Sequence, residues 1–268
     1  MIAIFKNESH ILKEWLDHYI KQGVEKICLI DNGSTDAYLS ILKPYIDSNK
    51  VLLHVDATKH SQTRLQNFYF YQESKKYTWC LVCDLDEFVY ARNGFNTIRD
   101  YVQSLPPSVS QVFIPWKLFG SNGYTQQPTN VVSSFTKRTN YNKESNFHGC
   151  RKEGNEVFSL TKCIARTSCT VQYDVHFHYM NAGSSISASN SPHPHGHFSK
   201  INEDILRASY LHLNHYAIQS YDWFMRVKAT RGDAVGSSGE NVRDESYFRG
   251  FDSASNDLDD TELASMNM

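Results

Sequence analysis

Short apolar runs alternate with helically spaced apolar residues in the first third of the chain. The apolar runs are residues 2–5, 24–31, 50–56 and 78–84. Between them, apolar residues recur three and four positions apart, which predicts helices. These predicted helices are residues 9–22, 34–46 and 62–76. Four strands separated by three helices predict right-handed βαβ units, hence an α/β fold with a parallel sheet that has helices on both faces.

The pattern in the rest of the chain is less regular. The predicted strands are 111–116, 158–165, 170–179 and 209–216, and the predicted helices are 96–105 and 218–232, the last ended by Gly232. Residues 181–200 are rich in Gly, Ser, Pro and His without periodicity, so we expect a mobile loop that closes over a bound ligand. The acidic residues 252–268 are expected to be a disordered tail.

We therefore predict a single domain over residues 1–251, with a nucleotide-binding half (1–90) and an acceptor-side half (91–251). In open α/β sheets, ligands bind beyond the carboxyl ends of the strands. Three polar clusters follow predicted strands, at residues 6–8, 31–36 and 84–87. Topology predicts that these clusters lie together.

Three carboxylates stand within four positions in the stretch "DLDE" that follows the fourth strand. Asp84 and Asp86 point the same way if the backbone stays extended, and paired carboxylates suit Mg²⁺ or Mn²⁺ held together with a phosphate. The alternative is structural. In that case Asp86 or Glu87 caps the next helix and the other carboxylates are solvated.

Composition narrows the partners and the compartment. The 268 residues carry a formal charge of −2, so no basic field favours nucleic acid as a partner. The six cysteines are scattered, and Cys80 and Cys83 would face opposite sides of a strand, which favours reduced thiols over a disulfide or a metal site. Without a signal-peptide pattern or an apolar run of transmembrane length, we expect a cytoplasmic protein. The sequons at Asn7 and Asn32 fall in the predicted binding turns, which also favours a compartment without N-glycosylation.

Three ordered motifs carry a family resemblance over most of residues 1–232. They are "KNESHILKEWLDHYIKQGVEKICLIDNGSTD", "WCLVCDLDEF" and "LNHYAIQSYDWFMRVKATRG". Together they resemble the GT-A glycosyltransferases of the glycosyltransferase-2-like and family-92-like group. This resemblance implies a GT-A fold, with a Rossmann-like, mostly parallel central sheet and a less regular acceptor-side half. It also implies transfer of a sugar from a nucleotide-sugar donor, by default a UDP-sugar, to a hydroxyl of a glycan, protein or lipid acceptor.

The resemblance implies a divalent metal, Mn²⁺ or Mg²⁺, at the D-x-D motif. Asp86 is the first choice as ligand and Asp84 the second, although Asp84 can instead reach the ribose or a metal-bound water. A further ligand is expected from a His near the C-terminal end of the domain. His215 is preferred to His212 because it matches the His-Tyr pair of the family, and for each His the alternative is a core residue bonded to a carbonyl.

Donor binding is assigned to residues at the strand ends and on two helices. Most of them match motifs of the family, whereas Arg64 and Gln66 are named for their place at the start of the third helix. The predicted donor-binding residues are Lys6, Asn7, Glu8, Asp31, Asn32, Arg64, Gln66, Asp84, Lys228 and Arg231. Asp31 is favoured for the ribose or base. Arg64 and Gln66 can instead be exposed helical residues without a role in donor binding. Lys228 and Arg231 can instead form surface salt bridges.

An inverting transferase needs a base near the acceptor hydroxyl, whereas a retaining one does not, and the sequence leaves this choice open. The base candidates are Asp174, Glu203 and Asp204, followed by Glu153 and Glu156. His176 and His178 can line the acceptor site or pack as strand residues. A zinc site at His193, His195 and His197 is disfavoured because the alternating Pro and Gly give it no set geometry.

Two other functions stay open. A nucleotidyltransferase acting on sugar phosphates would share the α/β sheet and a metal-held phosphate, but "IFKNESH" lacks the Gly-rich basic loop that such enzymes usually have. A catalytically inactive GT-A-like binding protein would keep the fold and show nucleotide binding that is absent or indifferent to metal.

Overall fold

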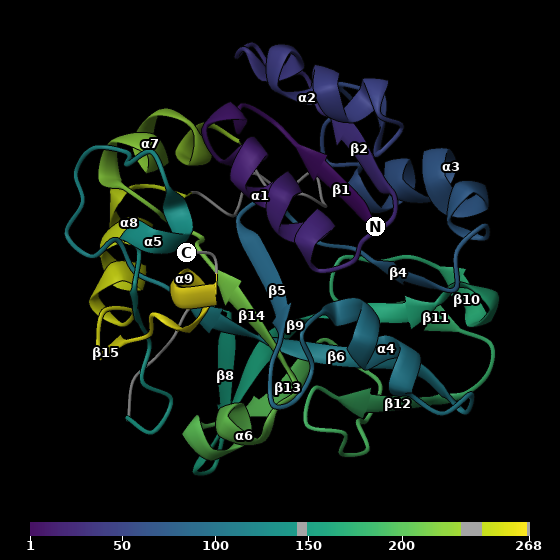
Figure 1. The fold of residues 1–268 in the computed structure, drawn as a ribbon. Coiled ribbons are helices and arrows are strands. Elements are labelled where there is room, and N and C mark those ends of the chain that lie inside the picture. Colours follow the sequence, from purple (N-terminus) through teal and green to yellow (C-terminus); the bar gives the residue numbers. More distant parts are fainter. Residues whose placement is uncertain (144–148, 232–242, 267–268) are drawn as a thin grey trace.

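The computed structural model describes residues 1–143, 149–231 and 243–266 of the chain. Its N-terminal part is a parallel sheet in the order β1-β2-β3, with helices in each connection (Figure 1). The strands are β1 (Ile2–Phe5), β2 (Ile27–Asp31) and β3 (Val51–Val55), and the helices are α1 (Ser9–Lys21), α2 (Tyr38–Asp47) and α3 (Gln62–Ser74). The predicted α/β class and the first three strand–helix units are confirmed.

Both faces of β1 and β2 are buried because alternate strand residues pack against different helices. Ala3 and Leu29 belong to the core that contains α1, whereas Ile2 and Ile30 belong to a separate cluster with Leu65 of α3. This alternation explains why the strands read as continuous apolar runs.

A second, larger sheet contains eight strands and is mainly antiparallel, which differs from the expected mostly parallel sheet. Its central path runs β13-β9-β6-β14-β5, and β4, β8 and β12 pair off this path. The strands are β4 (Trp79–Leu81), β5 (Glu87–Ala91), β6 (Val109–Leu118), β8 (Cys150–Glu153), β9 (Glu156–Arg166), β12 (Ser184–Ser187), β13 (Phe198–Ile201) and β14 (Leu211–His215). The predicted fourth strand, β4, pairs antiparallel with β9 and meets β1 only through a parallel bridge between Ile2 and Val82. The "DLDE" turn therefore follows the junction of the two sheets.

The remaining elements are short and flank these sheets (Figure 1). The helices are α4 (Ile98–Ser104), α5 (Val131–Ser134), α6 (Glu203–Ala208), α7 (Tyr221–Arg226), α8 (Glu245–Ser253) and α9 (Glu262–Met266), with 3-10 turns η1 (Thr167–Cys169) and η2 (Lys228–Thr230). The short strands are β7 (Lys137–Arg138), β10 (Thr170–Gln172), β11 (Tyr179–Met180) and β15 (Leu258–Asp259).

Several local predictions were wrong. Residues 181–200 are not a featureless loop, because β12 pairs with β6 and β13 pairs with β9. The stretch 170–179 forms two short strands separated by irregular chain, so His176 and His178 lie on no strand. The helix expected over 218–232 is α7 followed by η2, and Gly232 falls outside the described residues.

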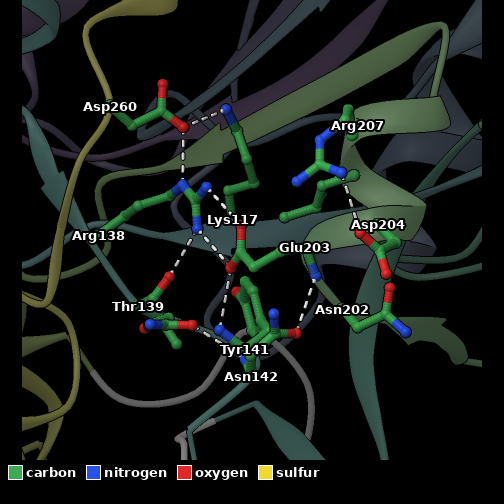
Figure 2. A network of polar contacts seen from close by, with 12 residues as sticks. Lys117, Arg138, Thr139, Tyr141, Asn142, Asn202, Glu203, Asp204, Arg207 and Asp260 are labelled. Atoms are coloured by element: carbon green, nitrogen blue, oxygen red, sulfur yellow. Dashed lines mark hydrogen bonds and ion pairs between the residues drawn. The ribbon is translucent and has the colours of Figure 1, made fainter.

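The acidic segment after Asp252 was also misread, because it is folded. Asp260 accepts from Lys117 at 2.8 Å and from the Arg138 Nε at 2.7 Å (Figure 2). Glu262 pairs with Arg92 at 2.8 Å. The expectation of disorder rested on acidity alone, and it failed because these acids pair with cations of the folded chain, among them the fully buried Lys117 of β6.

We predict that Asp260→Asn lowers the free energy of unfolding by about 3 kcal/mol, because Lys117 then stays fully buried without its closest carboxylate. Urea unfolding at pH 7 measures the change. Lys117 and Arg138 outweigh the cost of burial and hold the pKa of Asp260 at about 2. Since this pKa is depressed by folding, the difference between wild type and variant should be full above about pH 4 and should shrink as the pH falls toward 2.

Lys43→Met is the control, because it removes an exposed ion pair with Asp47 and should change stability by less than about 0.5 kcal/mol. The double variant Lys117→Met/Asp260→Asn should be more stable than Asp260→Asn alone. A single variant as stable as wild type would contradict a supporting role for Asp260.

Candidate functional site

A cleft of about 890 Å³ lies at the carboxyl end of β1, next to the "DLDE" turn. Residues from both halves of the chain line it, since its walls include residues of β6, β14 and η2. The predicted site residues that line it are Lys6, Glu8, Asn32, Asp84, Asp86, Asp174, His215, Lys228 and Arg231. The expectation that the polar clusters after β1 and β4 would share one site agrees with this geometry.

Helix α1 holds the "DLDE" turn in place through hydrogen bonds from its side chains. The indole Nε1 of Trp15 donates to the carbonyls of Asp84 and Glu87, each at 3.1 Å. The Tyr19 hydroxyl donates to the same Glu87 carbonyl at 3.0 Å. Trp15 and Tyr19 are fully buried, so the turn is fixed against the core rather than left as a surface loop.

Asp84 is paired with Lys162, a buried lysine that the sequence analysis missed. The Lys162 Nζ lies 2.7 Å from one carboxylate oxygen of Asp84, and Gln62 donates to the other at 3.0 Å. Burial opposes ionisation of Asp84, but Lys162 outweighs it and lowers its pKa. The signal in the sequence was a single Lys in the middle of the apolar strand "FSLTKCIA".

Lys162 also neutralises Glu87, whose nearer carboxylate oxygen is 3.4 Å away. That oxygen accepts the backbone N–H of Asp84 at 2.9 Å, so Glu87 closes the turn instead of capping a helix. Burial nevertheless raises the pKa of Glu87, against the opposing effect of Lys162. Two carboxylates therefore share one buried ammonium.

Asp86 is almost fully buried and has a different set of partners. Lys228 forms an ion pair with its Oδ2, and the His215 Nε2 lies 3.6 Å from its Oδ1. Burial opposes ionisation, but Lys228 and then His215 outweigh it and hold the pKa of Asp86 well below its ordinary range. Its backbone carbonyl accepts from Tyr216 at 2.8 Å, which ties the turn to the end of β14.

Asp86, Glu87 and His215 form a group whose potential ligand atoms all lie within 4.8 Å of one another. The strand register produces this group, because His215 of β14 stands directly opposite Glu87 of β5. Among the described residues, neither Oε1 of Glu87 nor Nδ1 of His215 has a hydrogen-bond partner, although both atoms are buried. The expected group of Asp84, Asp86 and His215 thus differs from the observed one, in which Glu87 takes the place of Asp84.

A second ion pair closes another side of the cleft. Arg231 lies 3.1 Å from Glu8, and its guanidinium sits over the Trp223 ring at 5.8 Å. Burial raises the pKa of Glu8, against the opposing effect of Arg231. Asn7 faces the neighbouring turn instead, where its backbone N–H donates to Ser34 and its side chain accepts from Thr35.

Asp31 and its neighbours organise the turn after β2. The two Asp31 carboxylate oxygens accept from the Ser34 backbone and the Tyr38 hydroxyl, at 2.8 and 2.9 Å, and Asp31 lies outside the cleft lining. Asn32 lines the cleft and donates to the Asp56 carbonyl. Asp36, in the same turn, accepts from the backbone N–H of Ser9 at the start of α1 at 2.8 Å.

Other predicted residues lie elsewhere. Arg64 is exposed and Gln66 is fully buried in α3, both outside the cleft lining, whereas Gln62 one turn earlier reaches Asp84. His212 pairs with Glu262 through Nδ1 and donates from Nε2 to the Leu206 carbonyl, which is the structural alternative for this residue.

Among the predicted bases, Asp174 lines the cleft. Glu203 instead accepts hydrogen bonds from both terminal nitrogens of Arg138, at 2.9 and 2.8 Å (Figure 2). Asp204 is exposed and pairs with Arg207. Glu153 and Glu156 are exposed as well, each in an ion pair on the surface. The geometry therefore argues against these four as bases.

An aromatic wall extends from His215 along the cleft. The Trp116 ring lies 4.2 Å from that of His215 and 5.3 Å from that of His176, and the His197 ring lies 6.0 Å from that of His176. Burial lowers the pKa of His176 to about 4, so this imidazole is neutral at pH 7. The His193 ring stacks on Phe113 at 4.0 Å. Among the described residues, His193, His195 and His197 do not belong to the group of potential metal ligands.

Comparison with known proteins adds a family to this geometry. The sequence model of the family described as "Glycosyltransferase family 92" matches residues 2–235. A glycosyltransferase family 92 protein of Ricinus communis is 25% identical over 135 residues, which are 49% of this chain and 24% of that protein. The match thus spans about a quarter of the length of this curated relative.

Similar solved structures include TarS 1–349 of S. aureus in complex with UDP-GlcNAc, which is 16% identical with a TM-score of 0.38, over 63% of this chain and 45% of that chain. Another is GalNAc-T7 with UDP, GalNAc and Mn²⁺, which is 11% identical with a TM-score of 0.44, over 89% of this chain and 45% of that chain. Among the described residues, no helix is long and apolar enough to cross a membrane.

We predict that Lys162→Met lowers the free energy of unfolding by about 3 to 5 kcal/mol, because Asp84 and Glu87 lose the ammonium that both contact. Urea unfolding at pH 7 measures this loss. Lys200→Met is the matched control, since Lys200 pairs with Glu156 on the exposed edge of the same sheet and its loss should cost less than about 1 kcal/mol. Equal effects of the two substitutions would contradict the role of Lys162.

Proposed function

The chain belongs to glycosyltransferase family 92, and from this premise we propose that it transfers a sugar from a nucleoside-diphosphate sugar to an acceptor hydroxyl. The observation that carries the proposal is the group formed by Asp86, Glu87 and His215. Asp86 and His215 of this group line one cleft together with the cations Lys228 and Arg231. Carboxylates, an imidazole and cations together suit a metal-held diphosphate. We infer UDP as the nucleotide and a glycan or glycoconjugate as the acceptor.

The cleft fits a divalent cation, Mn²⁺ or Mg²⁺. Support comes from two buried atoms, Oε1 of Glu87 and Nδ1 of His215, which lack hydrogen-bond partners within the described part of the chain. Asp86 and His215 would hold the ion, with Glu87 as the third ligand. Asp84 is less suited to direct ligation because Lys162 and Gln62 already occupy its oxygens. Such an ion, when bound, offsets the negative charge that develops on the leaving diphosphate.

Lys6, Lys228 and Arg231 would bind the diphosphate, because they bring positive charge to the cleft from the end of β1 and from the segment after α7. Asn32, at the end of β2, is better placed than Asp31 to face the nucleoside, since Asn32 lines the cleft. Glu8 keeps Arg231 in position through their ion pair. Arg64 and Gln66 are left out of the donor site.

The acceptor would lie along the aromatic wall of Trp116, His176 and His197. Sugar rings pack their C–H faces on aromatic rings, and this wall starts beside His215. Asp174 would take the proton of the acceptor hydroxyl if the reaction inverts the anomeric configuration. Its backbone neighbours support this placement, because Val175 donates to an Asp174 oxygen at 2.6 Å and orients the carboxylate.

We predict that UDP binds tightly only with Mn²⁺ present and that Asp86→Asn weakens this binding at least about tenfold, since a ligand carboxylate is lost. Isothermal titration calorimetry with MnCl₂ or with EDTA measures both effects. Asp204→Asn is the matched control, because Asp204 is exposed and lies outside the cleft lining. Equal UDP affinity with metal and with chelator would favour an inactive binding protein.

If the reaction inverts the anomeric configuration, we predict that Asp174→Asn lowers sugar transfer from the donor by about a hundredfold or more, while UDP affinity stays within about twofold of wild type. Hydrolysis and transfer assays across UDP- and GDP-sugars with Mn²⁺ measure the rate, again with Asp204→Asn as control. Full activity in Asp174→Asn would exclude this carboxylate as the base. Release of pyrophosphate in place of transfer would favour a nucleotidyltransferase.

A further inference from the structure

Lys228 is paired with the carboxylate of Asp86, which the proposed metal ion also needs as a ligand. Its ammonium forms an ion pair with Oδ2 of Asp86, while the His215 Nε2 lies 3.6 Å from the other oxygen. Lys228 reaches this position from η2, which follows α7, and its ammonium also lies 5.9 Å from the centre of the Trp223 ring. The pair is largely shielded from solvent, with 13% of the Lys228 side chain and 3% of the Asp86 side chain exposed.

A cation that binds Asp86 must therefore compete with this ammonium. Two positive charges cannot share one buried carboxylate without strong repulsion, because Coulomb interactions are weakly screened away from water. The other carboxylates around the turn are already matched, since Asp84 and Glu87 face Lys162 and Glu8 faces Arg231. If Lys228 leaves Asp86, it has no equivalent carboxylate to move to among these groups.

A bound diphosphate would supply the missing partner. Lys228 and Arg231 line the same cleft as Asp86, so a donor held there brings new negative charge next to the displaced ammonium. Lysine suits such a move because its four-carbon stem is flexible and its ammonium bonds in several directions.

We propose that Lys228 is an exchangeable counter-ion, which neutralises Asp86 while the cleft holds no metal and transfers to the donor diphosphate when metal and nucleotide bind. This inference rests on the proposed function, but its first half concerns Asp86 and the metal ion alone. It implies that the metal binds weakly before the nucleotide arrives and that the two ligands bind cooperatively.

The test is calorimetric titration of Lys228→Met with MnCl₂ alone and then with UDP at saturating Mn²⁺. Without nucleotide, the variant should bind Mn²⁺ about tenfold more tightly than wild type, because a charge-assisted contact no longer has to be broken. With Mn²⁺ present, the variant should bind UDP about tenfold more weakly, because the diphosphate loses an ammonium. The two affinities change in opposite directions, which neither a structural role nor a simple phosphate contact would produce.

Lys59→Met is the matched control, since Lys59 lines the same cleft from the connection between β3 and α3. It tests whether any lost positive charge in the cleft tightens Mn²⁺ binding, and we expect Mn²⁺ affinity close to that of wild type. Lys228→Arg, which keeps the charge, should retain weak Mn²⁺ binding. Tighter Mn²⁺ binding in Lys59→Met of the same size as in Lys228→Met would overturn the specific exchange.

A measurement on the wild-type protein covers the case in which Lys228→Met does not fold. Acetylation of Lys228 by an N-hydroxysuccinimide ester, quantified by mass spectrometry, should rise when Mn²⁺ is added alone and fall when UDP is then added. If the extent of Lys228 acetylation does not change when Mn²⁺ is added, the proposal is overturned.

Failure of the proposed function would give different binding results from failure of the Lys228 exchange. In that case wild type would bind Mn²⁺ with a change in Lys228 labelling, yet UDP would bind neither wild type nor variant. Mn²⁺ affinity unchanged or weaker in a folded Lys228→Met variant would instead overturn the exchange while leaving metal-dependent UDP binding in wild type intact.

Discussion

The pairing of buried Lys162 with Asp84 and Glu87 is the constraint on which the site depends. Three carboxylates within four positions would repel one another at the junction of two sheets, and one ammonium from β9 removes most of that cost. Helix α1 fixes the same turn through Trp15. With Asp84 and Glu87 held in this way, Asp86 is free to face the cleft, where Lys228 and His215 meet it.

The cations that balance this turn come from the second half of the chain. Lys162 lies on β9, and Lys228 and Arg231 follow α7. Glu8 and the "DLDE" turn, all in the first third of the chain, therefore carry carboxylates that pair with cations of later elements. This interdependence also appears in the core, where Trp15 of α1 shares one hydrophobic cluster with Tyr216 and with Leu263 near the C-terminal end. Folding of the two halves and assembly of the cleft are thus coupled.

Local pattern predicted the first strands and helices well because each is specified by its own apolar spacing. The ordered motifs also led to Asp86, His215, Lys228 and Arg231, which all line the cleft. Pairing between distant strands carries no such local signal. The sequence alone could not place His215 opposite Glu87 or Lys162 beside Asp84, and it therefore favoured Asp84 over Glu87 as a ligand. Glu203 was misjudged for the same reason, since its partner Arg138 lies on a distant short strand.

Charge counts mislead unless the partners of each charge are known. The acidic C-terminal segment resembled a disordered tail, yet Asp260 neutralises the buried Lys117. The same reasoning applies at the cleft, where an excess of carboxylates does not by itself indicate a metal. Asp84 is fully paired, whereas Oε1 of Glu87 and Nδ1 of His215 are buried without partners among the described residues. Unpaired buried polar atoms are costly, and these two belong to residues that group with Asp86, with potential ligand atoms within 4.8 Å of one another.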